Sequence, residues 1–244
     1  SLLSGATAEP TRVKVRGADG RERMAYPVRF LLDDEGSDRF RFGFARQEVV
    51  SQRLDLSVGY VALPDFQEAR VAEMERALAS LRDLPLLLLD LRGNPGGRIR
   101  TLQRIAGLFF EGPRAILQLH ENGAVETMRS IPGAVRYAGR VRVLVDERTG
   151  SAAELLAAAL QDLDRGTVYG KPTAGSARSR ESAVLPGGVI FHYAAAAEFK
   201  RIGGRPLEGL GVIPDVIVSP TRAELAGGGY GNPRRDAVVR RARG

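Results

Sequence analysis

A serine followed three residues later by a glutamate stands in DERTGSAAELLAAAL, where a polar turn gives way to an alanine- and leucine-rich run. This pattern predicts that Ser151 lies at the first turn of a helix. One interpretation is a capping box, in which Ser151 and Glu154 only satisfy backbone groups of that helix. The other is a nucleophile, because unpaired N–H groups and the helix dipole would stabilise an alkoxide or oxyanion there.

The segment LLLLDLRGNPGG, residues 86–97, offers a second chemical feature. An apolar strand ends in Asp-Leu-Arg and enters a turn rich in glycine. At the carboxyl end of a parallel strand, such a turn can present backbone N–H groups to a ligand, since glycine has no Cβ. The motif therefore indicates an anion or oxyanion site, with a plain strand-to-helix turn as the alternative.

Two later loops contain groups that could activate or orient a serine. A serine hydroxyl is a weak nucleophile and needs a base within hydrogen-bond reach. The loop YGKPTAGSARSRE contains Lys171, and GRPLEGLGVIPDVIV contains Glu208, which either orients a base or faces solvent. The histidines are His120 and His192, of which His192 lies in the strand-like VIFHYA and is interpreted as a core or surface residue.

The elements that must position these residues follow from hydrophobic periodicity. In the opening third, TRVKVRG and RMAYPVRFLL alternate as strands do, and the Asp-Gly pair between them predicts a hairpin. From about Ser57, strands such as VGYVALP and LLLLDL alternate with helices such as FQEARVAEMERALASLRDL and RTLQRIAGLFF. This alternation predicts an α/β fold with a largely parallel core sheet, and AILQLH and AVETMRS predict a further hairpin around ENG. Later short strands, including TVYG, GGVIFHYAA and GVIPDVIVS, indicate that the sheet is mixed.

Composition narrows the classes of function. The 244 residues suit one main core, and the absence of cysteine excludes disulfides and thiolate catalysis. Two histidines argue against a metal site, and we expect no metal or cofactor. The net charge of +7 is interpreted as a solvated basic surface rather than a nucleic-acid site. The apolar run LPLLLLDL is too short to span a membrane, and SLLSGATAEP lacks the pattern of a signal peptide.

Taken in order, VGYVALPDF, LLLLDLRGNPGG, VRVLVDERTGSAAELLAAAL, YGKPTAG and PLEGLGVIPDVIV resemble the S41 serine peptidases. This family contains the C-terminal processing peptidases and their tricorn-like and retinoid-binding-protein-like relatives. The resemblance implies an α/β core of the ClpP/crotonase-like type, with a mixed sheet and crossover helices. Upstream, LLSGATAEPTRVKVRGADGRERMAYPVR resembles the last part of a PDZ domain. The expected organisation is a PDZ-like tail at 1–32, a connector at 33–56, the peptidase core at 57–220 and a basic tail at 221–244.

The resemblance also implies roles for individual residues. Ser151 falls on the nucleophile, and the oxyanion donors would be the N–H of Ala152 and that of Gly97 or Gly96. In one branch of the family a lysine base directly follows the Thr-x-Gly motif, whereas here Ser176 occupies that position. In the tricorn-like branch a histidine from before the PDZ domain is the base, and Glu208 fits a supporting glutamate. That histidine would lie upstream of residue 1.

These observations predict a serine endopeptidase of the C-terminal processing type that acts on polypeptides, including C-terminal tails. The alternative is a catalytically impaired relative that binds peptides or apolar ligands, because Ser176 replaces the usual lysine. We expect no nucleic-acid partner and no stable membrane insertion, and homo-oligomerisation is left open. The family resemblance implies export to the periplasm or the cell exterior of a bacterium.

Overall fold

The computed structural model describes residues 13–16, 22–25, 48–185, 189–221 and 233–244. Within these ranges, only the backbone is described before residue 48 and at 180–196. The chain divides into two units, residues 1–44 and 45–244. In the first, β1 (Val13–Arg16) and β2 (Glu22–Ala25) pair antiparallel, which confirms the first predicted hairpin. The rest of the PDZ-like segment lies outside the described residues, so that assignment stays a prediction.

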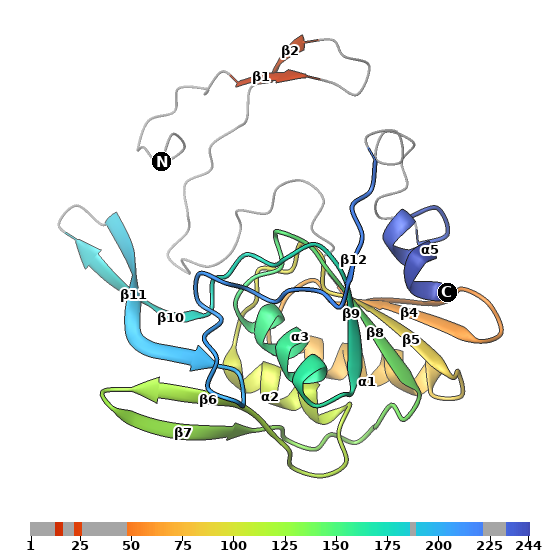
Figure 1. The fold of residues 1–244 in the computed structure, drawn as a ribbon, viewed down its shortest axis with the longest axis horizontal. Helices are drawn as coiled ribbons and strands as arrows, with labels where there is room; N and C mark the ends of the chain where they lie inside the picture. The colour runs from red at the N-terminus through yellow and green to blue at the C-terminus, as the bar shows by residue number, and fades with distance from the viewer. Residues whose placement is uncertain (1–12, 17–21, 26–47, 186–188, 222–232) are drawn as a thin grey trace. The chain divides into compact units, whose positions relative to one another are not determined.

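A six-stranded sheet forms the framework of the second unit in the part of the chain described (Figure 1). Its order is β12 (Val216–Ile217), β9 (Gly166–Gly170), β8 (Arg140–Val145), β5 (Leu86–Asp90), β4 (Val58–Ala62) and β3 (Val50–Arg53). Neighbours from β12 to β4 run parallel, and only β3 is antiparallel to its partner. The predicted α/β fold with a largely parallel, mixed sheet is therefore confirmed.

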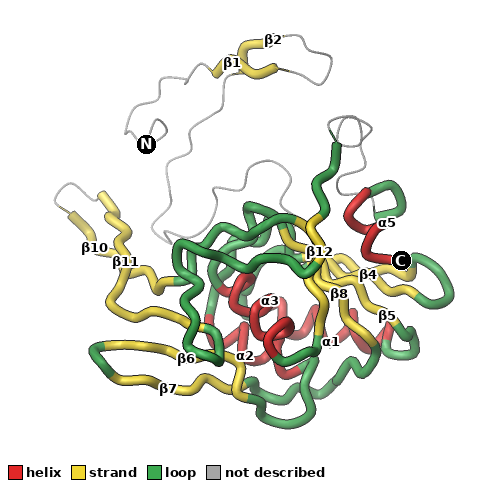
Figure 2. Tube along the Cα trace, in the orientation of Figure 1, coloured by secondary structure: helices red, strands yellow, loops and turns green. Residues whose placement is uncertain are grey.

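Both faces of the sheet are buried, as the apolar run in β5 requires. Leu87 and Leu89 pack into a core with α1 (Ala69–Leu81), α2 (Ile99–Gly107) and α3 (Ala152–Asp162). Leu86 and Leu88 point to the other face and pack with α5 (Ala237–Arg243), since successive strand residues alternate in direction. Figure 2 shows α5 on the opposite side of these strands from α3. Because β5 is covered on both faces, it has no face that must carry polar residues toward solvent.

A second sheet has the order β10 (Arg178–Leu185), β11 (Val189–Lys200), β6 (Ala115–Glu121) and β7 (Ala124–Arg129). The hairpin predicted around ENG is confirmed by β6 and β7. Strand β10 begins within YGKPTAGSARSRE, which was expected to be a loop, and β12 is shorter than the strand predicted in GVIPDVIVS. Helix α5 lies in the predicted basic tail. It contains three arginines and three buried residues, Val238, Val239 and Ala242.

The parallel strands bring three motifs to one edge of the sheet. The carboxyl ends of β5, β8 and β9 lead into residues 91–98, 146–151 and 171–177. Adjacent parallel strands deliver their following loops to the same edge, which is where α/β folds commonly place ligands. The N–H of Gly150 binds the Asn94 carbonyl (2.9 Å), and the N–H of Ala174 binds the Thr149 carbonyl (3.0 Å), so the three loops contact one another.

The end of α2 supplies a stability test. A Cβ on Gly107 would lie 1.8 Å from the Ile131 carbonyl oxygen, whereas a Cβ on Gly203 would meet nothing within 4 Å. Gly107→Ala should therefore destabilise the protein by about 1–3 kcal/mol, although alanine ordinarily favours a helix. Gly203→Ala should change stability by less than about 1 kcal/mol. Urea unfolding of both variants measures the difference, and equal midpoints would contradict this packing argument.

Candidate active site

Ser151 occupies a strained position at the start of α3. Its backbone has φ 50° and ψ −126°, in a region that residues with a Cβ rarely adopt. Such conformations cost about 1–3 kcal/mol each and persist only where the surrounding structure imposes them. They cluster at active sites, so the strain favours a functional role over simple capping.

The carboxylate of Glu154 holds the Ser151 turn. Its Oε2 accepts the N–H groups of Ser151 (2.9 Å) and Ser176 (2.8 Å). Its Oε1 accepts the Thr173 hydroxyl (2.5 Å) and the Gly175 N–H (2.7 Å). Glu154 has 0% exposed surface, so these four donors replace the water that its charge would otherwise need. One carboxylate thus joins the turn before α3 to the loop after β9.

The glycine-rich turn lies directly against Ser151. A Cβ on Gly96 would be 2.6 Å from the Ser151 Cβ and 2.7 Å from the Ala152 nitrogen, so no side chain fits at position 96. The Gly96 N–H donates to Asn94 Oδ1 at 2.8 Å. Within the described residues, the N–H groups of Gly97 and Ala152 donate to no acceptor. Two donors near the serine are therefore available to a ligand.

Asn94 fixes this turn to its surroundings. Its Nδ2 donates to the Leu63 carbonyl (2.9 Å), while its own carbonyl accepts the Gly150 N–H (2.9 Å). Asn94 is fully buried, so these bonds are shielded from competition by water. Gly150, which directly precedes Ser151, is consequently attached to the turn that carries Gly97.

No lysine or histidine side chain in the described set hydrogen bonds to the Ser151 hydroxyl. Lys171 Nζ lies 3.4 Å from Glu147 Oε1 at the surface. His120 belongs to β6, where its Nε2 lies 3.1 Å from Gln118 Oε1. The His192 side chain falls outside the described residues, although the backbone of His192 in β11 pairs with Ser182 of β10.

Glu208, in the loop between β11 and β12, contacts the residues that follow Ser176 in the loop that enters β10. Glu208 Oε2 accepts the N–H groups of Ala177 (2.7 Å) and Arg178 (2.9 Å). Ser176 is exposed, and its N–H shares Glu154 Oε2 with that of Ser151. Position 176 is therefore held close to Ser151, while Glu208 fixes the next two residues. Catalytic roles for both residues remain predictions.

Sequence reasoning treated Glu154 only as a capping residue and did not select Asn94 or Thr173. The spacing of Glu154 from Ser151 signalled the local bond, but its contacts with residues 173–176 depend on the tertiary fold. Thr173 was visible only as part of the TAG motif. Asn94 gave no separate signal within its glycine-rich turn.

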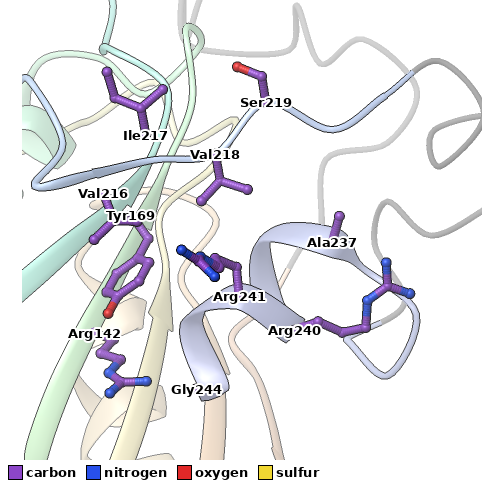
Figure 3. Close-up of a pocket in the computed structure, with 10 residues that line it drawn as sticks. All are labelled: Arg142, Tyr169, Val216, Ile217, Val218, Ser219, Ala237, Arg240, Arg241 and Gly244. Carbon is purple, nitrogen blue, oxygen red and sulfur yellow. The ribbon is translucent and has the colours of Figure 1, made fainter.

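One hollow lies away from the predicted site residues. About 680 Å³ in volume, it opens between α5 and the edge of the sheet, beside Tyr169, Val216 and Arg241 (Figure 3). None of the predicted site residues lines it. Within the described ranges, no group of three histidine, aspartate or glutamate residues could hold a metal ion. No helix in those ranges is long and apolar enough to cross a membrane.

The bonds of Glu154 predict a large effect from a small substitution. Glu154→Gln would place an amide N–H₂ opposite two donors and should lower the free energy of unfolding by about 3 kcal/mol. Glu147→Gln is the matched control, because the Glu147 side chain is 60% exposed and its ion pair contributes about 0–1 kcal/mol. Denaturant unfolding compares the two, and similar losses would rule out a special role for Glu154.

Curated relatives share the sequence pattern of this core. A probable CtpA-like serine protease of Staphylococcus epidermidis is 28% identical over 169 residues, covering 67% of this chain and 34% of the relative. Carboxyl-terminal-processing peptidase 3, chloroplastic, of Arabidopsis thaliana is 29% identical over 161 residues, covering 65% and 31%. The chain thus spans about a third of the length of these relatives.

Solved structures share the fold. The photosystem II D1 C-terminal processing protease superposes with a TM-score of 0.66 at 22% identity, covering 86% of this chain and 56% of that one. Mature CPAF complexed with lactacystin gives a TM-score of 0.70 at 15% identity, covering 98% and 68%. The family model described as Peptidase family S41 matches residues 57–218, which include every site residue considered above. This chain belongs to peptidase family S41.

Proposed function

We propose that the chain is the core of a serine endopeptidase of the C-terminal processing type, with Ser151 as its nucleophile. The observation that carries this proposal is the strained Ser151 turn beside two N–H groups, of Ala152 and Gly97, that have no acceptor within the described chain. A capping serine requires neither feature. Donors fixed in advance at the point where negative charge develops are often the largest contribution to catalysis.

In the proposed reaction, Ser151 Oγ attacks the carbonyl carbon of a peptide bond while its proton passes to a base. The carbonyl oxygen becomes an oxyanion that accepts hydrogen bonds from the Ala152 and Gly97 N–H groups. The positive end of the α3 dipole points to the same place and favours the developing charge. Collapse of the intermediate expels the amine, which takes the proton from the base, and water then releases the acyl group by the same steps.

Gly97 is the proposed second donor in preference to Gly96. The Gly96 N–H is already bound to Asn94 Oδ1, and using it would break a buried hydrogen bond. Breaking such a bond would offset the gain, since a buried polar group left unpaired costs about 1–3 kcal/mol. Gly96 acts instead by allowing the turn to approach Ser151.

We propose that the base is supplied by a side chain outside the described residues. Lys171 is engaged with Glu147 and His120 with Gln118, and Ser176 carries no group of suitable basicity. Glu208 is proposed to support the site by fixing the entrance to β10, directly after Ser176. Polypeptides, including C-terminal tails, are the proposed substrates, and export from a bacterial cell is the proposed setting.

The nucleophile can be tested directly. A fluorophosphonate probe should label the protein on Ser151, as located by peptide mapping, because the probe traps an activated serine as a covalent adduct. Ser151→Ala should lose the label, whereas Ser176→Ala should retain it. Equal labelling of the wild type and Ser151→Ala would eliminate Ser151 as the nucleophile.

A second candidate function is peptide binding without turnover, favoured by Ser176 at the position of the usual lysine. It predicts that the wild type binds unstructured peptides but is not labelled by the probe. Ser176→Lys should then create labelling on Ser151, because a positioned base contributes about 10²–10⁴-fold and position 176 is held near the serine. Ser179→Lys adds the same charge elsewhere and should not. A wild type that is already labelled and turns over peptides would reject this candidate.

A further inference from the structure

Asp236 uses its two carboxylate oxygens for different tasks. Oδ1 accepts the N–H groups of Val238 (2.9 Å) and Val239 (3.2 Å) and so caps α5. Oδ2 accepts a hydrogen bond from Arg92 Nη1 at 2.8 Å. Asp236 is 2% exposed, and an ion pair shielded from water holds its geometry more firmly than one at the surface. Asp236 thus connects the C-terminal helix to the first residues of the glycine-rich turn.

Arg92 is held rigidly on its other side. Its Nε and Nη2 donate to Asp90 Oδ1 (2.8 Å) and Oδ2 (2.7 Å), and the Tyr60 hydroxyl donates to the same Oδ2 (2.6 Å). Burial disfavours the charged guanidinium, yet the carboxylates of Asp90 and Asp236 keep the pKa of Arg92 well above its usual value. The side chain therefore stays charged and fixed between two carboxylates.

The position of Arg92 bears on the proposed oxyanion donor. The chain leaves β5 at Asp90 and reaches Gly97 seven residues later, with Arg92 as its first anchored side chain. The Gly93 N–H, next along the chain, donates to Asp146 Oδ1 (2.8 Å). Asp146 precedes the Ser151 turn in the sequence. Arg92 therefore fixes the start of the short segment that carries the Gly97 N–H near its other end.

We infer that Asp236, at the start of the C-terminal helix, is a positioning residue for the oxyanion turn. The inference rests on the proposed function in one respect, because the turn affects rate only if Gly97 binds an oxyanion. A displacement of about 1 Å by a distant substitution can cost up to about a hundredfold in rate.

Helix α5 has other attachments, so this ion pair can be removed without detaching the helix. Val238, Val239 and Ala242 pack into the second core. Arg142 Nη1 donates to the Ala242 carbonyl at 2.5 Å, and Arg243 pairs with Asp55. In Figure 3 the helix lies beside Arg142 and Tyr169, with Arg241 directed toward the sheet.

The decisive variant is Asp236→Asn, because asparagine caps helices about as well as aspartate but cannot pair with Arg92 through a charge. Its rate constant for fluorophosphonate labelling should fall about tenfold, and in peptide hydrolysis kcat should fall with KM unchanged. Val239→Ala is the matched control, since it removes buried contacts of the same helix and leaves the ion pair intact. Its labelling rate should equal that of the wild type at a temperature where both variants are folded.

Amide NMR provides a readout that does not require activity. In ¹H–¹⁵N spectra, Asp236→Asn should shift the Gly96 and Gly97 amide resonances, whereas Val239→Ala should leave them in place. If those resonances shift but the wild type is never labelled, the positioning role stands and the proposed peptidase function fails. If labelling and both resonances in Asp236→Asn match the wild type, or if Val239→Ala produces the same changes, the inference is overturned.

Discussion

The candidate site depends on one buried charge, the carboxylate of Glu154. An ionised group removed from water is strongly unfavourable unless hydrogen-bond donors surround it. Here the donors come from the turn before α3 and from three residues of the loop after β9. Satisfying that charge obliges the two segments to meet. The strain at Ser151 is sustained by the same bonds, since its N–H is one of the four donors.

The sheet gives this arrangement a rigid base. Its central strands are covered on one face by α1, α2 and α3 and on the other by α5. Parallel order then fixes which loops can meet, because the carboxyl ends of β5, β8 and β9 share an edge. Gly96 allows the closest approach between two of those loops. The geometry near Ser151 is thus a product of strand order, one missing side chain and one buried carboxylate.

Periodicity alone predicts much of the fold, because long apolar or amphipathic runs have few alternatives. The strand in LLLLD, the helix after Ser151 and the hairpin around ENG are examples. Helix α5 was less predictable, because it is short and its three buried residues stand among arginines, which weakens the hydrophobic pattern. The order of motifs predicts which residues belong to the candidate site, and their roles stay predictions. Their contacts were not predictable, because the bonds of Glu154 to the loop after β9 and of Arg92 to Asp236 link residues far apart in sequence.

The four bonds of Glu154 also bear on when the site can form during folding. Helix α3 and its capping pair are local, and they can form as soon as that stretch of chain is available. The other three donors lie at Thr173, Gly175 and Ser176, beyond β9. Before that strand docks, three of the four donors to the Glu154 carboxylate are missing, and the Ser151 turn is not yet joined to the loop after β9. The capping pair can thus form early, whereas the complete set of bonds around Glu154 forms only once β9 has joined the sheet.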